Sequence, residues 1–185
     1  MSEEKIVEKK KELGLTIHKK IVFIMWAGDG MPKGEKILQE LIDSNIDAQI
    51  MIVCGRNQHL QHHAQHIAQM HKNYTIKIFW FVDFMYDLVN IADMIITKGW
   101  PATLMEILMM NKIPVLNSYI REQEKWNMEF VVKNNVGIYE PNIKKMITTV
   151  HAMLSSDLSV YHQNIHNLHL KNGTEEVAEY LLKRG

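Results

Sequence analysis

The sequence predicts an α/β fold: a doubly wound, Rossmann-like sheet of six parallel strands. Short segments rich in Ile, Val, Phe and Met recur along the chain, and a longer amphipathic stretch separates each from the next. This rhythm is typical of repeated β/α units. The short segments are almost continuously apolar rather than alternating, which favours strands covered by helices on both faces and therefore a parallel sheet.

The strand candidates are short runs of mostly branched or aromatic side chains, which fit buried strands. In chain order they are Ile21–Met25, Gln49–Cys54, Ile76–Trp80, Met94–Thr97, Ile113–Leu116 and Gly137–Tyr139. Right-handed crossovers between them would place helices on both faces of the sheet.

The stretches around the strands show the apolar spacing of amphipathic helices. Six of them alternate with strands: Lys33–Ser44, Gln58–His71, Met85–Ile91, Ala102–Met110, Gln123–Asn134 and Lys144–Leu154. Leu158–Leu170 and Glu175–Lys183 follow the last strand, and Asn172-Gly173 marks the break between them. A short charged helix is expected at Glu3–Leu13, ahead of the first strand.

Composition indicates one globular domain. The 185 residues include 21 Lys and Arg against 21 Asp and Glu, and 46% are hydrophobic, which is enough for one core. No linker or repeat divides the chain, so a single domain over residues 1–185 is expected, with 155–185 as a helical extension. The balanced charge argues against a strongly basic nucleic-acid-binding module.

The cellular setting is predicted from cysteine usage and hydropathy. Cys54 is the single cysteine, which excludes an internal disulfide framework and a cysteine zinc site and fits a reducing compartment. No apolar run reaches the ~20 residues that cross a bilayer. The amino terminus also lacks the apolar core of a secretory signal. A cytoplasmic protein is therefore expected.

Ligands of doubly wound sheets bind outside the carboxyl ends of the strands, so the loops there are the candidate site. Those loops contain Gly28-Asp29-Gly30, Cys54–Asn57, Phe81–Asp83, Thr97–Glu106 and Asn117–Asn127. The glycine pair allows backbone amides to face a phosphate, but it also fits an ordinary strand-to-helix turn. Asp83 likewise fits a simple helix cap.

Taken in order, these loops resemble the carboxyl-terminal half of one group of GT-B glycosyltransferases. The group includes monogalactosyldiacylglycerol synthase, processive diacylglycerol glucosyltransferases and the N-acetylglucosaminyltransferase that makes lipid II. The motifs are Gly28–Met31, Cys54–Asn57, Phe81–Asp83 with Met85, Thr97-Lys98 with Pro101, Thr103 and Glu106, and Gln123-Glu124 with Asn127. The similarity runs from about Glu3 to Leu154 and is nearer to the diacylglycerol branch, through Ile52–Asn57 and Val131–Gly137.

The resemblance implies a binding site for a UDP-sugar donor. The backbone of Val82, beside Phe81, would hold the uracil, and Glu106 would accept hydrogen bonds from the ribose hydroxyls. Amides of Ala102 and Thr103, at a helix N-terminus, would bind the diphosphate. The chemistry is consistent, because a carboxylate suits a vicinal diol and a helix N-terminus suits a phosphate.

The resemblance implies further donor contacts at two other loops. The Gly28-Asp29-Gly30 loop would share the diphosphate, and Gln123 and Glu124 would bind hydroxyls of the sugar, which could be glucose, galactose or N-acetylglucosamine. No metal or other cofactor is expected, since the helix N-terminus would stabilise the leaving UDP.

In GT-B enzymes the acceptor pocket and the catalytic base belong to an amino-terminal domain, which has no counterpart in this sequence. The resemblance therefore implies the UDP-sugar-binding half of an enzyme that transfers a hexosyl group to a lipid acceptor such as diacylglycerol. It would have no catalytic residue of its own and no activity alone. Its expected partners are UDP or a UDP-hexose and the acceptor domain or a partner subunit, through which it would associate peripherally with a membrane.

Some positions depart from the pattern of this group. Bulky or non-glycine residues stand where glycines are expected, namely Trp26, Ala27, Pro32, Trp100, Ala102 and Glu122. Because glycine lets a backbone approach a ligand, the indoles of Trp26 and Trp100 could close the donor pocket. The alternative function is therefore a non-catalytic binding or scaffold domain. A flavodoxin-like or response-regulator domain also fits the β/α rhythm, but the sequence lacks their acidic cluster or flavin loops.

Two histidine groups and several methionines have simple structural explanations. His59, His62 and His66, like His162, His166 and His169, have a helical spacing that could hold a transition metal, but such residues commonly lie on a solvated face. The methionines of the Ala102–Met110 helix are interpreted as core fillers, with a groove for a partner as the alternative.

Overall fold

The computed structural model describes residues 1–25, 33–173 and 179–183. One parallel sheet has the strand order β3-β2-β1-β4-β5-β6. Its strands are β1 (Ile21–Ile24), β2 (Gln49–Val53), β3 (Ile76–Phe79), β4 (Met94–Lys98), β5 (Ile113–Ser118) and β6 (Ile138–Tyr139). The predicted doubly wound α/β fold is confirmed, and the strand order is the one found in Rossmann folds.

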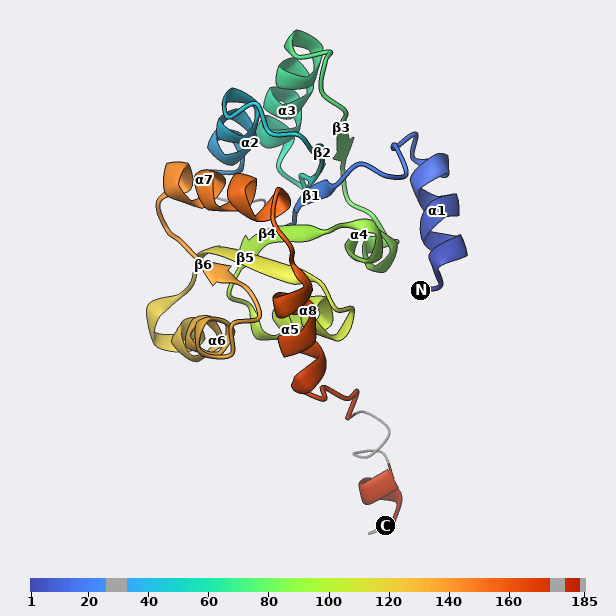
Figure 1. Ribbon diagram of the computed structural model, residues 1–185, viewed down its shortest axis with the longest axis vertical. Helices are drawn as coiled ribbons and strands as arrows, with labels where there is room; N and C mark the ends of the chain where they lie inside the picture. The colour runs from blue at the N-terminus through green and yellow to red at the C-terminus, as the bar shows by residue number, and fades with distance from the viewer. Residues whose placement is uncertain (26–32, 174–178, 184–185) are drawn as a thin grey trace.

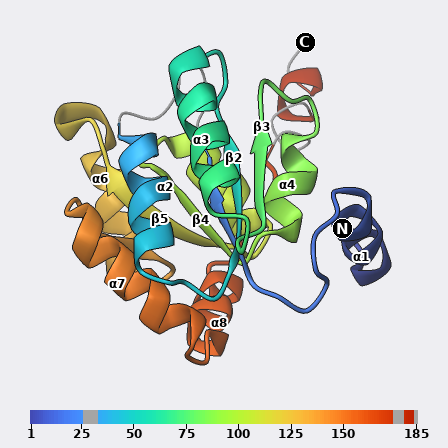
Figure 2. The ribbon, with the colours of Figure 1, turned by 90° about the horizontal axis from the view of Figure 1, so that it is seen from above.

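Helices cover both faces of the sheet, with α2, α3 and α7 on one side and α1 and α4 on the other (Figures 1 and 2). The helices are α1 (Glu3–Glu12), α2 (Gly34–Asp43), α3 (Gln58–Met70), α4 (Met85–Ile91), α5 (Pro101–Met109), α6 (Arg121–Lys133), α7 (Ile143–Leu154) and α8 (Ser159–Asn167). Among the described residues, no helix has the length and apolar character needed to cross a membrane.

The central strand β1 is apolar throughout because it contributes to two cores. Val22 and Ile24 of β1 pack into the core that also holds Leu38 of α2. Phe23, between them, points to the opposite face and packs with Leu88 of α4. Successive strand side chains point to opposite faces, so a strand covered on both sides needs an uninterrupted apolar run. Each fully buried large side chain stabilises the fold by about 1.5–3 kcal/mol.

Most predicted boundaries agree with the structure to within two residues, and the differences have local causes. β5 continues to Ser118 because that residue pairs with Lys98 after a register shift in β4. α6 begins at Arg121, two residues before its predicted start. There the buried Glu124 carboxylate accepts a hydrogen bond from the amide of Ile120, the residue that precedes the helix. α8 ends at Asn167, close to His169, whose positive φ of 47° ends a right-handed helix.

The predicted Glu175–Lys183 helix lies partly outside the described residues, and residues 179–182 are helical. α8, by contrast, belongs to the body of the protein. Ile165 on α8 and Leu158 just before it are both buried in the larger core.

Gly137 provides a test of the packing between β5 and β6. A Cβ added there would meet the carbonyl oxygen of Pro114 and lie 2.8 Å from its Cγ, so backbone or ring atoms would have to move. We expect Gly137→Ala to lower the free energy of unfolding by about 1–3 kcal/mol in a chemical denaturation experiment. Gly173→Ala is the matched control, because nothing lies within 4 Å of its added Cβ. Equal stabilities for the two variants would contradict the packing described.

Candidate functional site

The strand order places a crevice between the carboxyl ends of β1 and β4, which are neighbours in the sheet. The chain continues from β1 to β2 on one side of this crevice and from β4 to β5 on the other. Crevices of this kind are the usual ligand sites of doubly wound sheets. The Gly28-Asp29-Gly30 loop and Trp26, which the sequence analysis assigned to this crevice, lie outside the described residues.

The β4–α5 loop forms one wall of the crevice and is held by its neighbours. The amide of Gly99 donates to the Ser118 carbonyl at 3.0 Å, and its own carbonyl accepts a 2.8 Å bond from the Asn127 side chain. A Cβ at Gly99 would lie 3.2 Å from the Cβ of Tyr119. The loop therefore packs closely against the start of α6, and a larger residue at this position would push the two apart.

α5 begins at Pro101 and has no side-chain cap. Its first intrahelical bond joins the Leu104 amide to the Trp100 carbonyl at 2.9 Å. The amides of Ala102 and Thr103 precede that bond and point out of the helix start, where a helix dipole favours negative charge. These are two of the residues predicted to contact a diphosphate.

The β3–α4 loop presents an exposed aromatic ring beside a partly buried valine. Phe81 has 68% of its surface exposed, whereas Val82 packs partly into the smaller core. Phe84 fixes the end of the loop through an edge-to-face contact with Phe79, with ring centroids 6.0 Å apart. The Phe81 ring therefore projects into solvent from a loop that packs against the protein through Val82 and Phe84.

Glu106 lies on a cavity of about 570 Å³ between α4 and α5. The cavity is lined by Met85, Tyr86, Val89, Glu106, Met109, Met110 and Asn172. Met85 and Tyr86 open α4, directly after the loop that carries Phe81 and Val82. The structure thus brings the residues predicted to bind a nucleobase and a ribose to the same side of α5.

Gln123 and Glu124, the predicted sugar contacts, have different environments at the start of α6. Gln123 is exposed, whereas Glu124 is only 4% exposed and its Oε2 accepts a 2.7 Å hydrogen bond from the Ile120 amide. Glu124 therefore holds the first turn of α6, a role that the sequence reasoning missed. A Glu at the fourth helical position was the available signal, because acidic side chains near helix starts often bond free amides.

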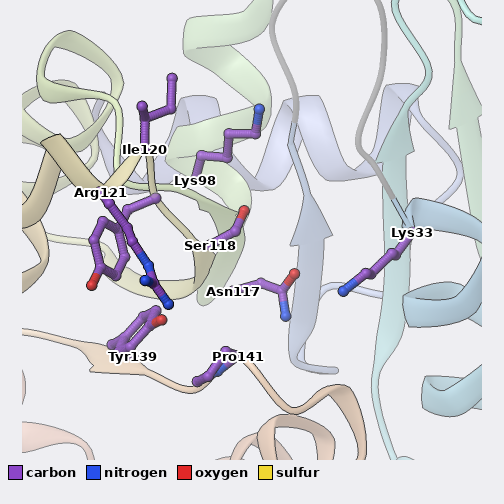
Figure 3. Close-up of a pocket in the computed structure, with 9 residues that line it drawn as sticks. Lys33, Lys98, Asn117, Ser118, Ile120, Arg121, Tyr139 and Pro141 are labelled. Carbon is purple, nitrogen blue, oxygen red and sulfur yellow. The ribbon is translucent and has the colours of Figure 1, made fainter. Parts of the chain in front are cut away.

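The structure also shows a polar cavity of about 390 Å³ at the carboxyl ends of β4 and β5, lined in part by the Thr97–Glu106 and Asn117–Asn127 loops that the sequence analysis named as candidates (Figure 3). Lys33, Arg121 and Tyr139 line it from three separate segments. Its residues are too far apart in sequence to form a motif.

His59, His162 and Cys54 have ordinary surroundings. The exposed His59 ring lies 2.6 Å from the Glu35 carboxylate, and His162 contacts Asn111. The described residues contain no group of three His, Cys, Asp or Glu side chains placed to hold a metal ion. Burial raises the pKa of Cys54 to about 11, so its thiol is protonated at neutral pH and a poor nucleophile.

The fold and its crevice are those of the carboxyl-terminal domain of a GT-B glycosyltransferase. MurG from Acinetobacter baumannii superposes with a TM-score of 0.72 at 14% identity, over 96% of this chain and 53% of that protein. The model of the glycosyltransferase family 28 C-terminal domain matches residues 30–179. The chain therefore belongs to this family, as the sequence motifs indicated.

Curated relatives include enzymes that act on diacylglycerol. Monogalactosyldiacylglycerol synthase 1 of Arabidopsis thaliana is 29% identical over 85% of this chain. The processive diacylglycerol beta-glucosyltransferase of Bacillus licheniformis is 27% identical over 100% of it. The chain spans 31% of the plant enzyme and 48% of the bacterial one. It is a glycosyltransferase carboxyl-terminal domain related to lipid glycosyltransferases.

Glu124 offers a test of how the start of α6 is held. Removing its carboxylate in Glu124→Ala leaves the Ile120 amide without its acceptor, so we expect a loss of about 1–2 kcal/mol in unfolding free energy. Glu124→Gln keeps an oxygen acceptor and should lose less. Glu122→Ala, an exposed change in the same turn, is the control and should stay within about 0.5 kcal/mol of the parent. If Glu122→Ala costs as much as Glu124→Ala, the bond between the Glu124 carboxylate and the Ile120 amide is not what holds the turn.

Proposed function

We propose that this domain binds UDP-sugars and forms the donor half of a glycosyltransferase that transfers a hexosyl group to a lipid acceptor such as diacylglycerol. The observation that carries the proposal is the arrangement around α5. Its uncapped N-terminus, Glu106 on its side and the Phe81–Val82 loop before α4 occur together in a member of this family. In a nucleoside diphosphate, the helix N-terminus would suit the diphosphate, the Glu106 carboxylate the ribose hydroxyls and the Phe81–Val82 loop the base.

The nucleoside would lie on the α4 side of α5. The Phe81 ring is exposed and available to a base, and the backbone beside it supplies hydrogen-bonding groups. The Glu106 carboxylate is exposed and would accept hydrogen bonds from both ribose hydroxyls. This arrangement supports a ribonucleotide over a deoxyribonucleotide, because the latter offers one hydroxyl fewer.

The diphosphate would face the start of α5. When the bond from the sugar to the diphosphate oxygen breaks, negative charge grows on UDP, and the Ala102 and Thr103 amides with the helix dipole would stabilise it. The acceptor oxygen would form the new bond to the sugar and lose its proton to a base. We propose that this reaction needs no metal ion.

The base and the acceptor pocket are proposed to come from another domain or subunit. The chain spans less than half the length of its diacylglycerol-glycosylating relatives. The domain alone is therefore expected to bind the donor without turnover. Contact with a membrane would then come through the acceptor half.

Glu106 provides the direct test of donor binding. Glu106→Ala should weaken UDP binding about tenfold in a calorimetric titration, because two charge-assisted hydrogen bonds are lost. Glu106→Gln should weaken it less, since an amide oxygen still accepts. The exposed Glu122→Ala change is the charge-matched control and should bind like the parent. Unchanged affinity in Glu106→Ala would contradict the assigned role.

The alternative, a scaffold domain with an occluded pocket, is tested at Trp100. This indole keeps 50% of its surface exposed, which supports a ring available for stacking rather than one packed into the crevice. We expect Trp100→Gly to bind UDP no more tightly than the parent. A parent that binds no UDP together with a Trp100→Gly variant that does would favour the occluded scaffold.

A further inference from the structure

A cavity of about 360 Å³ lies where α5 and α8 both end, and Figure 1 shows these two helices beside each other. Its lining combines apolar side chains with two imidazoles, a thioether, an amide and an ammonium: Leu108, Met109, Asn111, Ile165, His166, His169, Leu170 and Lys171. α5 leads from the carboxyl end of β4 to the amino end of β5, so its last turn lies at the amino edge of the sheet. None of the residues assigned to the UDP-sugar lines this cavity.

The turn that ends α8 brings two imidazoles together. The amide of His169 donates to the carbonyl of His166 at 3.1 Å, and His169 has a positive φ of 47°. The two rings meet edge to face, with centroids 6.0 Å apart and planes at 65°. Among the described residues, neither ring has a hydrogen-bond or ion-pair partner. Their nitrogen atoms are therefore accessible to a ligand in the cavity.

Met109 adds a sulfur atom from the opposite wall. It is the last residue of α5 and is 46% exposed, although methionine is usually a buried residue. Imidazole and thioether ligands suit Cu(I), whereas Mg²⁺ and Ca²⁺ require oxygen ligands such as carboxylates, and no described carboxylate lines the cavity. A thioether as third ligand also distinguishes this cavity from sites with three His, Cys, Asp or Glu side chains, which the described residues lack.

Two helix C-termini meet at this cavity. α5 ends at Met109 and α8 ends at Asn167. A helix C-terminus carries a partial negative charge, which stabilises a nearby cation. Lys171 acts in the opposite direction, because its ammonium is the one formal charge among the described residues that line the cavity. Removing this charge should therefore strengthen the binding of a cation and weaken the binding of an anion.

We propose that this cavity binds one Cu(I) ion through His166, His169 and Met109. Bonds from imidazole nitrogen to metal are about 2 Å long, so rings with this spacing can reach a common ion after rotation of their side chains. The ion would join the end of α5 to the end of α8. This site goes beyond the proposed donor function and takes no part in sugar transfer.

The first experiment measures the Cu(I) affinity of the purified chain without oxygen, in competition with the coloured chelator bicinchoninate. We expect one ion per chain and a loss of affinity of about tenfold or more in the double variant His166→Gln with His169→Gln, because removing a ligand costs at least as much as removing a group that orients one. The double variant His62→Gln with His66→Gln is the matched control, since these exposed residues of α3 lie outside the cavity. No binding by the parent, or equal losses in the two double variants, would overturn the proposal.

A second variant tests the sulfur ligand. Met109→Leu keeps an apolar side chain of similar size, so we expect the fold to persist and the Cu(I) affinity to fall, with a smaller effect on Zn²⁺. Met105→Leu, on the same helix but outside the cavity, should bind Cu(I) like the parent. Circular dichroism of each variant checks the fold. Unchanged Cu(I) affinity in a folded Met109→Leu variant would contradict the assigned ligand set.

The sign of the effect at Lys171 separates a cation site from an anion site. Lys171→Gln should tighten Cu(I) binding, because it removes a like charge from the cavity. Inorganic phosphate, used as the anionic probe, should bind neither the parent nor this variant measurably. Weaker Cu(I) binding in Lys171→Gln, or phosphate binding that this variant loses, would overturn the proposal.

Discussion

Burial of both faces of the sheet is the constraint on which the rest of this structure depends. In β1, Phe23 packs into one core and Val22 and Ile24 pack into the other, so both faces of this central strand are apolar. Because all strands are parallel, their carboxyl ends and the loops that follow them meet at one edge. The proposed donor site therefore lies at that edge, and the two cores hold it rigid.

The position of the β4–α5 loop links this constraint to the site. The register shift in β4 and the bonds of Gly99 to Ser118 and Asn127 place the start of α5 against the start of α6. Glu124 stabilises the second of these helix starts by bonding the Ile120 amide. Lys98 at the end of β4 and Arg121 at the start of α6 both line the polar cavity at this junction.

The fold was predictable from the sequence because uninterrupted apolar runs are required by a sheet buried on both faces. The placement of Glu106 near the β3–α4 segment followed from the family motifs. The structural role of Glu124 was missed, because its burial depends on how α6 packs against Gly99. The contribution of Lys33 and Tyr139 to the polar cavity could not be predicted, since they line it together only when the strand order brings their segments to the same edge.

The most direct test of the central claim is a calorimetric titration of the unmodified chain with UDP, combined with tryptophan fluorescence of the same samples. The account predicts saturable binding and a change in emission, because the half-exposed Trp100 stands at the start of α5 where the diphosphate would bind. No heat and no change in emission up to millimolar UDP would contradict it, and would mean that this domain keeps the fold of its family without the ability to bind the nucleotide.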